Sequence, residues 1–218
     1  YDIKNVVAAD EWAENIDNNA FTNASAKANL YAATEAAKLL GIAPNADWKN
    51  VADNIPILKM DNGVTREHAS YNGEGIKQGD VNLLAYPLKE ITDPAQVKKD
   101  LDYYSTRVPN EGTPAMTQAI FALLYSRLGD ADRAAHFFKD SYEPNLLPPF
   151  RVIAETKGGT NPYFATGAGG ILQCVLMGFG GLDITPKGIT QIKTALPNNW
   201  KSLTLKGIGM EKKTYFLK

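Results

Sequence analysis

The amino-acid sequence changes character near residue 181, and this change limits the fold more than any other feature. Before it, apolar residues recur at helical spacing between turn signals. After it, apolar and polar residues alternate over four short segments, which is typical of strands. These segments begin at Leu182, Thr190, Leu203 and Thr214. We therefore predict a mainly α fold, with a helical domain over residues 1–181 and a small antiparallel β domain over residues 182–218.

Start and stop signals divide the first part into separate helices. The Ala-rich run 22–40 consists of good helix formers and ends before Gly41. Asp93-Pro94 and Thr113-Pro114 each place a proline at a first helical position. The stretch 61–75 shows no period and is predicted to be an exposed loop, while the prolines of 142–161 exclude a regular helix there. The predicted helices cover residues 22–40, 47–58, 78–90, 94–104, 114–128, 130–139 and 167–179.

Composition argues against several classes of function. The formal net charge of −1 at pH 7 disfavours a nucleic-acid binder and gives no electrostatic attraction to an anionic membrane. No run approaches the ~20 apolar residues of a membrane span. The single cysteine, Cys174, cannot form an internal disulfide or a thiolate metal site, and His68 and His136 are the only histidines. We predict no metal, no cofactor, no nucleic-acid partner and no membrane partner.

Carboxylates remain as candidates for catalysis. The chain has neither a Gly-rich phosphate loop with Lys-Ser/Thr nor a Gly-x-Ser-x-Gly motif. Glu11 precedes Trp12, an indole that could raise the pKa of Glu11 or stack on a sugar ring. Glu155 follows the apolar run 150–154. Two such carboxylates suit the acid and base of glycoside hydrolysis, although either one alone is more often a surface or capping residue.

Two further motifs leave more than one interpretation open. Lys77 and Gln78 follow a Gly-rich loop and could donate hydrogen bonds to sugar hydroxyls, or lie in an exposed first turn. The glycines of residues 167–170 fit close helix packing better than a dinucleotide site, because no strand precedes them.

Longer motifs resemble those of glycoside hydrolase family 65, in the right order along nearly the whole chain. Residues 10–23 (DEWAENIDNNAFTN) look like the family's Asp-Glu-aromatic and Asn-Asn-Ala-aromatic-Thr-Asn signature. Residues 76–84 (IKQGDVNLL) resemble its Lys-Gln-Ala-Asp-Val segment, with Gly79 in place of the usual alanine. Residues 112–117 and 164–170 resemble later blocks. Residues 182–185 and 196–200 resemble the start of its C-terminal β-domain.

The resemblance implies the C-terminal half of an (α/α)6 barrel followed by a β-sandwich-like domain. It assigns Glu11 as the general acid and Glu155 as the general base. An acid that works near neutral pH needs a raised pKa, which we expect Trp12 and burial to supply for Glu11. The substrate-binding residues that it implies are Trp12, Lys77 and Gln78, with Glu74 as a weaker candidate.

The resemblance also favours hydrolysis over phosphorolysis. The family's phosphorylases hold phosphate with blocks that contain histidine and paired serines, and residues 112–117 and 165–172 contain neither. A carboxylate at the nucleophile position would also repel phosphate. We therefore expect an inverting exo-α-glucosidase that acts on α-1,2-linked glucosides of the kojibiose type. The alternatives are a hydrolase of trehalose or another α-glucobiose, a disaccharide phosphorylase, and a non-catalytic sugar-binding helical module.

The number of helices predicts a partner. An (α/α)6 barrel has twelve helices, and about half of them are visible in the sequence. We expect a missing N-terminal part of the same enzyme, possibly on a separate chain, to complete the barrel. The sequence does not fix the localisation, and a periplasmic or secreted bacterial protein is slightly favoured.

Overall fold

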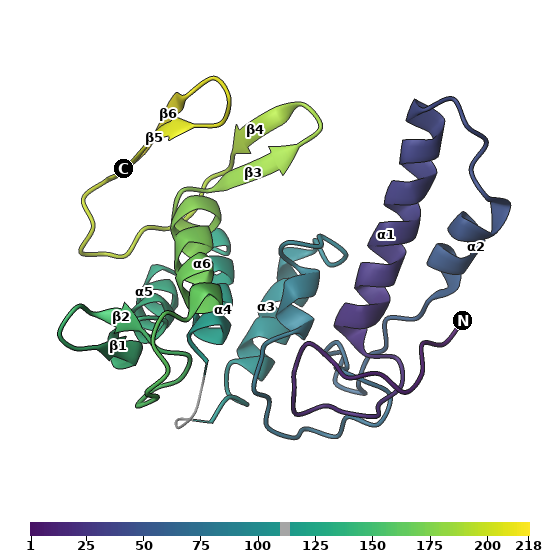
Figure 1. Ribbon diagram of the computed structural model, residues 1–218, viewed down its shortest axis with the longest axis horizontal. Helices are drawn as coiled ribbons and strands as arrows, with labels where there is room; N and C mark the ends of the chain where they lie inside the picture. Colours follow the sequence, from purple (N-terminus) through teal and green to yellow (C-terminus); the bar gives the residue numbers. More distant parts are fainter. Residues whose placement is uncertain (110–113) are drawn as a thin grey trace. The chain divides into compact units, whose positions relative to one another are not determined.

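The computed structural model describes residues 1–109 and 114–218, which form two compact units, Tyr1–Val108 and Pro109–Lys218 (Figure 1). Helices dominate the described chain, and its named strands pair into three antiparallel two-stranded sheets. Within these ranges, no helix combines the length and apolar character that crossing a membrane requires. The predicted fold class is therefore confirmed. The domain boundary at residue 181 stays a prediction.

The first unit contains three α-helices and one 3-10 helix. Helix α1 (Ala20–Leu39) packs against α2 (Ala46–Asn54), and the 3-10 helix η1 (Val81–Leu84) contacts both α1 and α3 (Pro94–Tyr104). Side-chain caps fix where the helices begin: Asn19 accepts a hydrogen bond from the Thr22 N–H, and Asp93 accepts from two N–H groups of α3. The predicted helix starting at Pro94 is confirmed.

The second unit is built around α4 (Ala115–Arg127), which is buried on nearly every side. Helix α5 (Ala131–Asp140), helix α6 (Ala165–Gln173) and the π-helical turns η3 (Cys174–Phe179) pack against it. Glycine allows the close approach: a Cβ on Gly178 would lie 2.9 Å from the Leu123 Cα, and one on Gly170 would lie 3.2 Å from the Ala119 Cβ. The interpretation of the Gly-rich motif as helix packing is confirmed.

The β structure lies in the second unit as hairpins (Figure 1). After the 3-10 turn η2 (Glu143–Asn145), β1 (Leu146–Leu147) pairs with β2 (Val152–Ile153). Then β3 (Leu182–Thr185) pairs with β4 (Gly188–Gln191), and β5 (Leu203–Ile208) pairs with β6 (Lys213–Leu217). The four alternating segments of the sequence are the four strands β3 to β6, as predicted.

The predicted helix over residues 78–90 is wrong, since only Val81–Leu84 form a 3-10 turn there. The sequence favours local hydrogen bonds, but this segment bonds elsewhere: the Lys77 N–H and the Gln78 side chain bond to residues 10 and 11. Gly79 and Pro87 weaken a helix further, because glycine has high backbone entropy and proline lacks an N–H.

Two other expectations need correction. Helix α2 ends at Asn54 rather than near residue 58, because Ile55 precedes Pro56 and takes an extended conformation (φ −71°, ψ 124°). The stretch 61–75 is irregular, as predicted, but it is not exposed: its buried members are Val64, Thr65, Glu67 and Tyr71. A segment without a periodic pattern can still be buried, because tertiary contacts can fix its side chains in the interior.

Candidate active site

A tight turn near the start of the chain carries the first candidate residues. The two sides of the turn are joined by an antiparallel bridge between Val6 and Ile16 and by the hydrogen bond from the Ala8 N–H to the Ala13 carbonyl, 2.9 Å long. Ala8, Ala13 and Ile16 form a small buried apolar cluster with Val6 against it. The turn itself, residues 10–12, therefore projects from a fixed base.

Asp10 joins this turn to the segment that begins at Lys77. Its buried carboxylate accepts a hydrogen bond from the Trp12 N–H at 3.1 Å, and both of its oxygens lie 3.1 Å from the Lys77 N–H. Burial raises the pKa of Asp10, while these backbone hydrogen bonds lower it. No role was predicted for Asp10, yet its hydrogen bonds fix the positions of Trp12 and Lys77.

Glu11, Lys77 and Gln78 come together at the surface of the first unit. The Lys77 ammonium and the Gln78 amide both donate to Oε2 of Glu11, the amide at 3.1 Å, and the Glu11 N–H donates back to the Gln78 Oε1 at 3.0 Å. The Glu11 side chain is exposed. Hydrogen bonds from Lys77 and Gln78 lower the pKa of Glu11, so the expected raised pKa is wrong for this arrangement. Trp12 does not bury the carboxylate.

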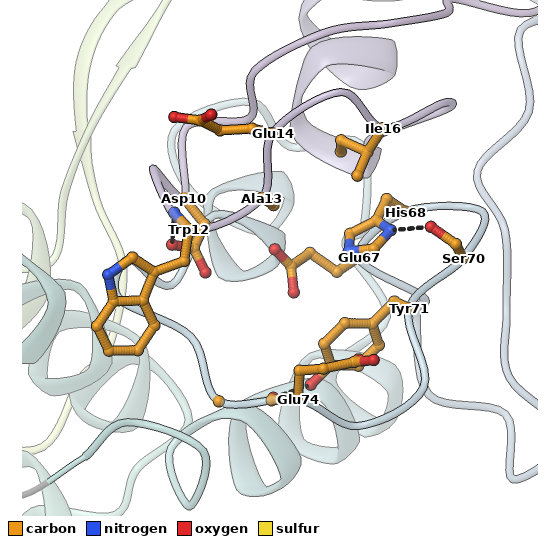
Figure 2. Close-up of a pocket in the computed structure, with 11 residues that line it drawn as sticks. Asp10, Trp12, Ala13, Glu14, Ile16, Glu67, His68, Ser70, Tyr71 and Glu74 are labelled. Atoms are coloured by element: carbon orange, nitrogen blue, oxygen red, sulfur yellow. Dashed lines mark hydrogen bonds between the residues drawn. The ribbon is translucent and has the colours of Figure 1, made fainter.

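Next to this cluster lies a pocket of about 220 Å³ (Figure 2). Such a volume is below the ~300 Å³ at the lower end of drug-sized sites and suits a ligand as small as one sugar ring. Trp12 and Glu74, two of the predicted substrate-binding residues, line it together with Asp10. The Trp12 indole is 57% exposed and offers an apolar plate on which a sugar ring can stack.

The loop on the other side of the pocket carries His68, Tyr71 and Glu74. Glu74 accepts a hydrogen bond from the Asn72 N–H at 2.7 Å, and backbone bonds of this kind lower the pKa of its carboxyl. The Tyr71 hydroxyl donates to the Glu74 carbonyl at 2.9 Å, which ties the loop together. Burial lowers the pKa of His68, whose ring lies edge-on to Tyr71.

Two buried carboxyl groups, those of Asp80 and Glu67, were not predicted. Asp80 accepts a hydrogen bond of 2.8 Å from the Asn19 amide, and burial raises its pKa to about 7. Glu67 is buried in the pocket wall, where burial and nearby carboxylates raise its pKa to about 9. Asp80 lies within the second motif, so its spacing from Gln78 was a usable signal. Glu67 lies in the unpatterned loop, where the sequence offers no signal.

Glu155, the predicted base, lies in the second unit directly after β2. Its carbonyl accepts hydrogen bonds from the Ala115 N–H and from the Asn145 amide, each 3.0 Å long, so its backbone is held against the start of α4. Its half-buried side chain accepts from the Asn161 amide at 3.3 Å. Because Glu11 and Glu155 belong to separate units, their pairing as acid and base stays a prediction. Part of the 112–117 block lies outside the described residues.

Among residues 1–109 and 114–218, no group of three or more His, Cys, Asp or Glu side chains is placed to hold a metal ion. The chemistry that this part of the chain offers is that of carboxyl groups, a lysine, amides and an indole around a small pocket.

We first compared the chain with known families and solved structures. No family model matches the chain. Its fold is shared with a solved structure from the human microbiome whose name assigns it to the kojibiose phosphorylases: the TM-score is 0.69 at 17% identity, over 94% of this chain and 33% of that one. This similarity shows a shared fold.

Curated protein sequences show much higher similarity. All 218 residues align with the kojibiose hydrolase of Mucilaginibacter mallensis at 75% identity and with that of Flavobacterium johnsoniae at 65% identity. Over its whole length the chain is therefore similar to part of these enzymes, which confirms the predicted resemblance to the kojibiose-type hydrolases. It spans about a third of the length of the curated relatives it matches, 32% of each.

Proposed function

We propose that the protein containing this chain is an inverting exo-α-glucosidase that releases glucose from α-1,2-linked glucosides such as kojibiose. The observation that carries the proposal is the contact of Lys77 and Gln78 with the Glu11 carboxylate beside the pocket. The high identity with enzymes named kojibiose hydrolase over the whole chain supports the choice of reaction and linkage.

In this proposal, Glu11 donates its proton to the glycosidic oxygen as the bond from that oxygen to the anomeric carbon breaks and the aglycone leaves. Hydrogen bonds from Lys77 and Gln78 lower the pKa of Glu11, so a proton is poorly held there. Sugar hydroxyls that accept from Lys77 and Gln78 compete with Glu11 for these donors. Substrate binding therefore weakens their hold on the carboxylate and, by excluding water, disfavours its charge, and both effects raise its pKa towards that of a working acid.

Glu155 supplies the base in the proposed mechanism. As a carboxylate it accepts a proton from a water molecule on the face of the sugar opposite to Glu11, and the water oxygen forms a bond with the anomeric carbon as the glycosidic bond breaks. An inverting mechanism needs about 6.5–9.5 Å between the two carboxyl groups to leave room for that water. The Asn145 and Asn161 amides, which bond to the backbone and side chain of Glu155, support it as an oriented group.

The test is glucose release from kojibiose by the full-length protein, with and without phosphate. Glu11→Gln and Glu155→Gln are each expected to lower kcat by about 10²- to 10⁴-fold, since each removes one proton-transfer group. The matched control is Glu143→Gln, which changes an exposed glutamate paired with Lys139 and should leave kcat unchanged. Phosphate-dependent formation of glucose 1-phosphate, or full activity of Glu155→Gln, would contradict the proposal.

A further inference from the structure

Glu67 occupies an unusual position for a carboxyl group. It is only 1% exposed, although the segment that carries it is irregular chain between α2 and η1. Its backbone is fixed to the start of α1, because its carbonyl accepts from the Ala20 N–H at 2.7 Å and from the Asn19 amide at 3.2 Å. The backbone that carries this side chain is therefore anchored beside the pocket. Figure 2 shows it pointing into the space flanked by Trp12 and Tyr71.

One oxygen of this carboxyl group is buried without a partner. Oε1 of Glu67 makes no hydrogen bond with any group in the described part of the chain. Buried polar atoms in folded proteins are nearly always satisfied, so an orphan in a pocket wall indicates that something else supplies its partner. Two hydrogen bonds to the Glu67 carbonyl oxygen anchor its backbone at the start of α1, which opposes a shift of the loop that would relieve the orphan.

The charge around Glu67 defines the chemistry of that partner. Burial first, and then the charges of Asp80, Asp10 and Glu74, raise the pKa of Glu67 to about 9. Near neutral pH the group is therefore an uncharged carboxylic acid, which has one O–H donor as well as acceptor oxygens. A hydroxyl group likewise donates and accepts, whereas an anionic ligand would meet the negative charge of the neighbouring carboxylates.

We propose that the carboxyl group of Glu67 binds a hydroxyl group of the glucosyl unit in this pocket. The identity of the sugar rests on the proposed function. The Trp12 indole provides a face for the apolar side of the ring, and the pocket of about 220 Å³ fits a single sugar ring. Glu67 thus acts in sugar recognition and is separate from the acid Glu11 and the base Glu155.

The test is calorimetric titration of the full-length protein with glucose, which reports binding without any turnover. Glu67→Leu removes both hydrogen-bonding functions at similar volume, and we expect glucose to bind about 10- to 100-fold more weakly. Glu67→Gln keeps a donor and an acceptor in the same shape, and its affinity should stay within about threefold of wild type. The matched controls are Glu90→Leu and Glu90→Gln, at a residue that pairs with Lys27 outside the pocket; neither should change glucose binding.

Unchanged affinity in Glu67→Leu, or no glucose binding by the wild type, would overturn the proposal. If Glu67→Leu does not fold, the pH dependence of glucose binding by the wild type serves as the test instead. Ionisation of Glu67 removes its O–H donor, so glucose affinity should fall as the pH rises through about 9, and Glu67→Gln should abolish this fall. A fall that persists in Glu67→Gln would contradict the proposal. The other titratable groups facing Glu67 are Asp10, His68, Tyr71, Glu74, Asp80 and Tyr104.

Binding and turnover separate this inference from the proposed function. If the protein binds glucose through Glu67 but does not hydrolyse kojibiose, the proposed reaction fails and the sugar site stands. If kojibiose is hydrolysed and Glu67→Leu keeps the wild-type glucose affinity, the reaction stands and the role of Glu67 fails.

Discussion

Asp10→Asn tests how the candidate acid is held in position. The Asp10 carboxylate accepts from the Trp12 N–H through Oδ1 and from the Lys77 N–H through both oxygens, each at 3.1 Å. Asparagine keeps one acceptor oxygen and turns an NH₂ group towards a backbone N–H, where two donors face each other. The loss is about one hydrogen bond to a charged group, roughly 1.5–3 kcal/mol.

Hydrogen exchange measures this loss at the atoms concerned. In the full-length protein, the Lys77 and Trp12 amides of Asp10→Asn should exchange about 10- to 150-fold faster than in the wild type. Because Lys77 then holds Glu11 less firmly, kcat/KM for kojibiose should fall by about 10- to 100-fold. Asp102→Asn is the matched control, since it changes a half-buried aspartate paired with Lys98 outside the pocket. Wild-type exchange at both amides with unchanged kcat/KM would refute the reasoning.

Three further predictions test other parts of the structure. Lys77→Met removes the main cause of the lowered pKa of Glu11, so the alkaline limb of kcat/KM should move to higher pH; a limb that stays in place would contradict this. Gly178→Ala places a Cβ 2.9 Å from the backbone of α4 and should destabilise the protein to thermal unfolding by about 1–3 kcal/mol, whereas Gly169→Ala, which points into open space, should not. Asn19→Ala removes the cap of α1 and a hydrogen bond to a buried carboxyl group, and should cost about 1–3 kcal/mol in denaturant unfolding.

Local signals predicted most of the secondary structure. Asp93 and Asp130 cap α3 and α5 as their positions before the helices indicate, and Gly41 follows the end of α1. The strands β3 to β6 follow the alternating pattern of their residues. These features depend on residues that are neighbours in the sequence, so local sequence patterns are enough to predict them.

The errors arose where distant residues decide the conformation. The apolar spacing of residues 78–90 fits a helix, but the segment bonds to a turn 67 positions earlier and stays irregular. For the same reason burial in the stretch 61–75 was missed, including Glu67. The motifs correctly brought Glu11, Lys77 and Gln78 to one site, but the lowered pKa of Glu11 depends on contact geometry that a sequence does not contain.

The central claim is that the family's acid and base catalyse hydrolysis with inversion. The most direct measurement is proton NMR of the glucose first released by the full-length protein from kojibiose whose reducing end is blocked as a methyl glycoside. Hydrolysis with inversion releases β-glucose first, at the same rate with or without phosphate, and α-glucose is expected to form only by later mutarotation. Initial release of α-glucose, or release as glucose 1-phosphate, would contradict it.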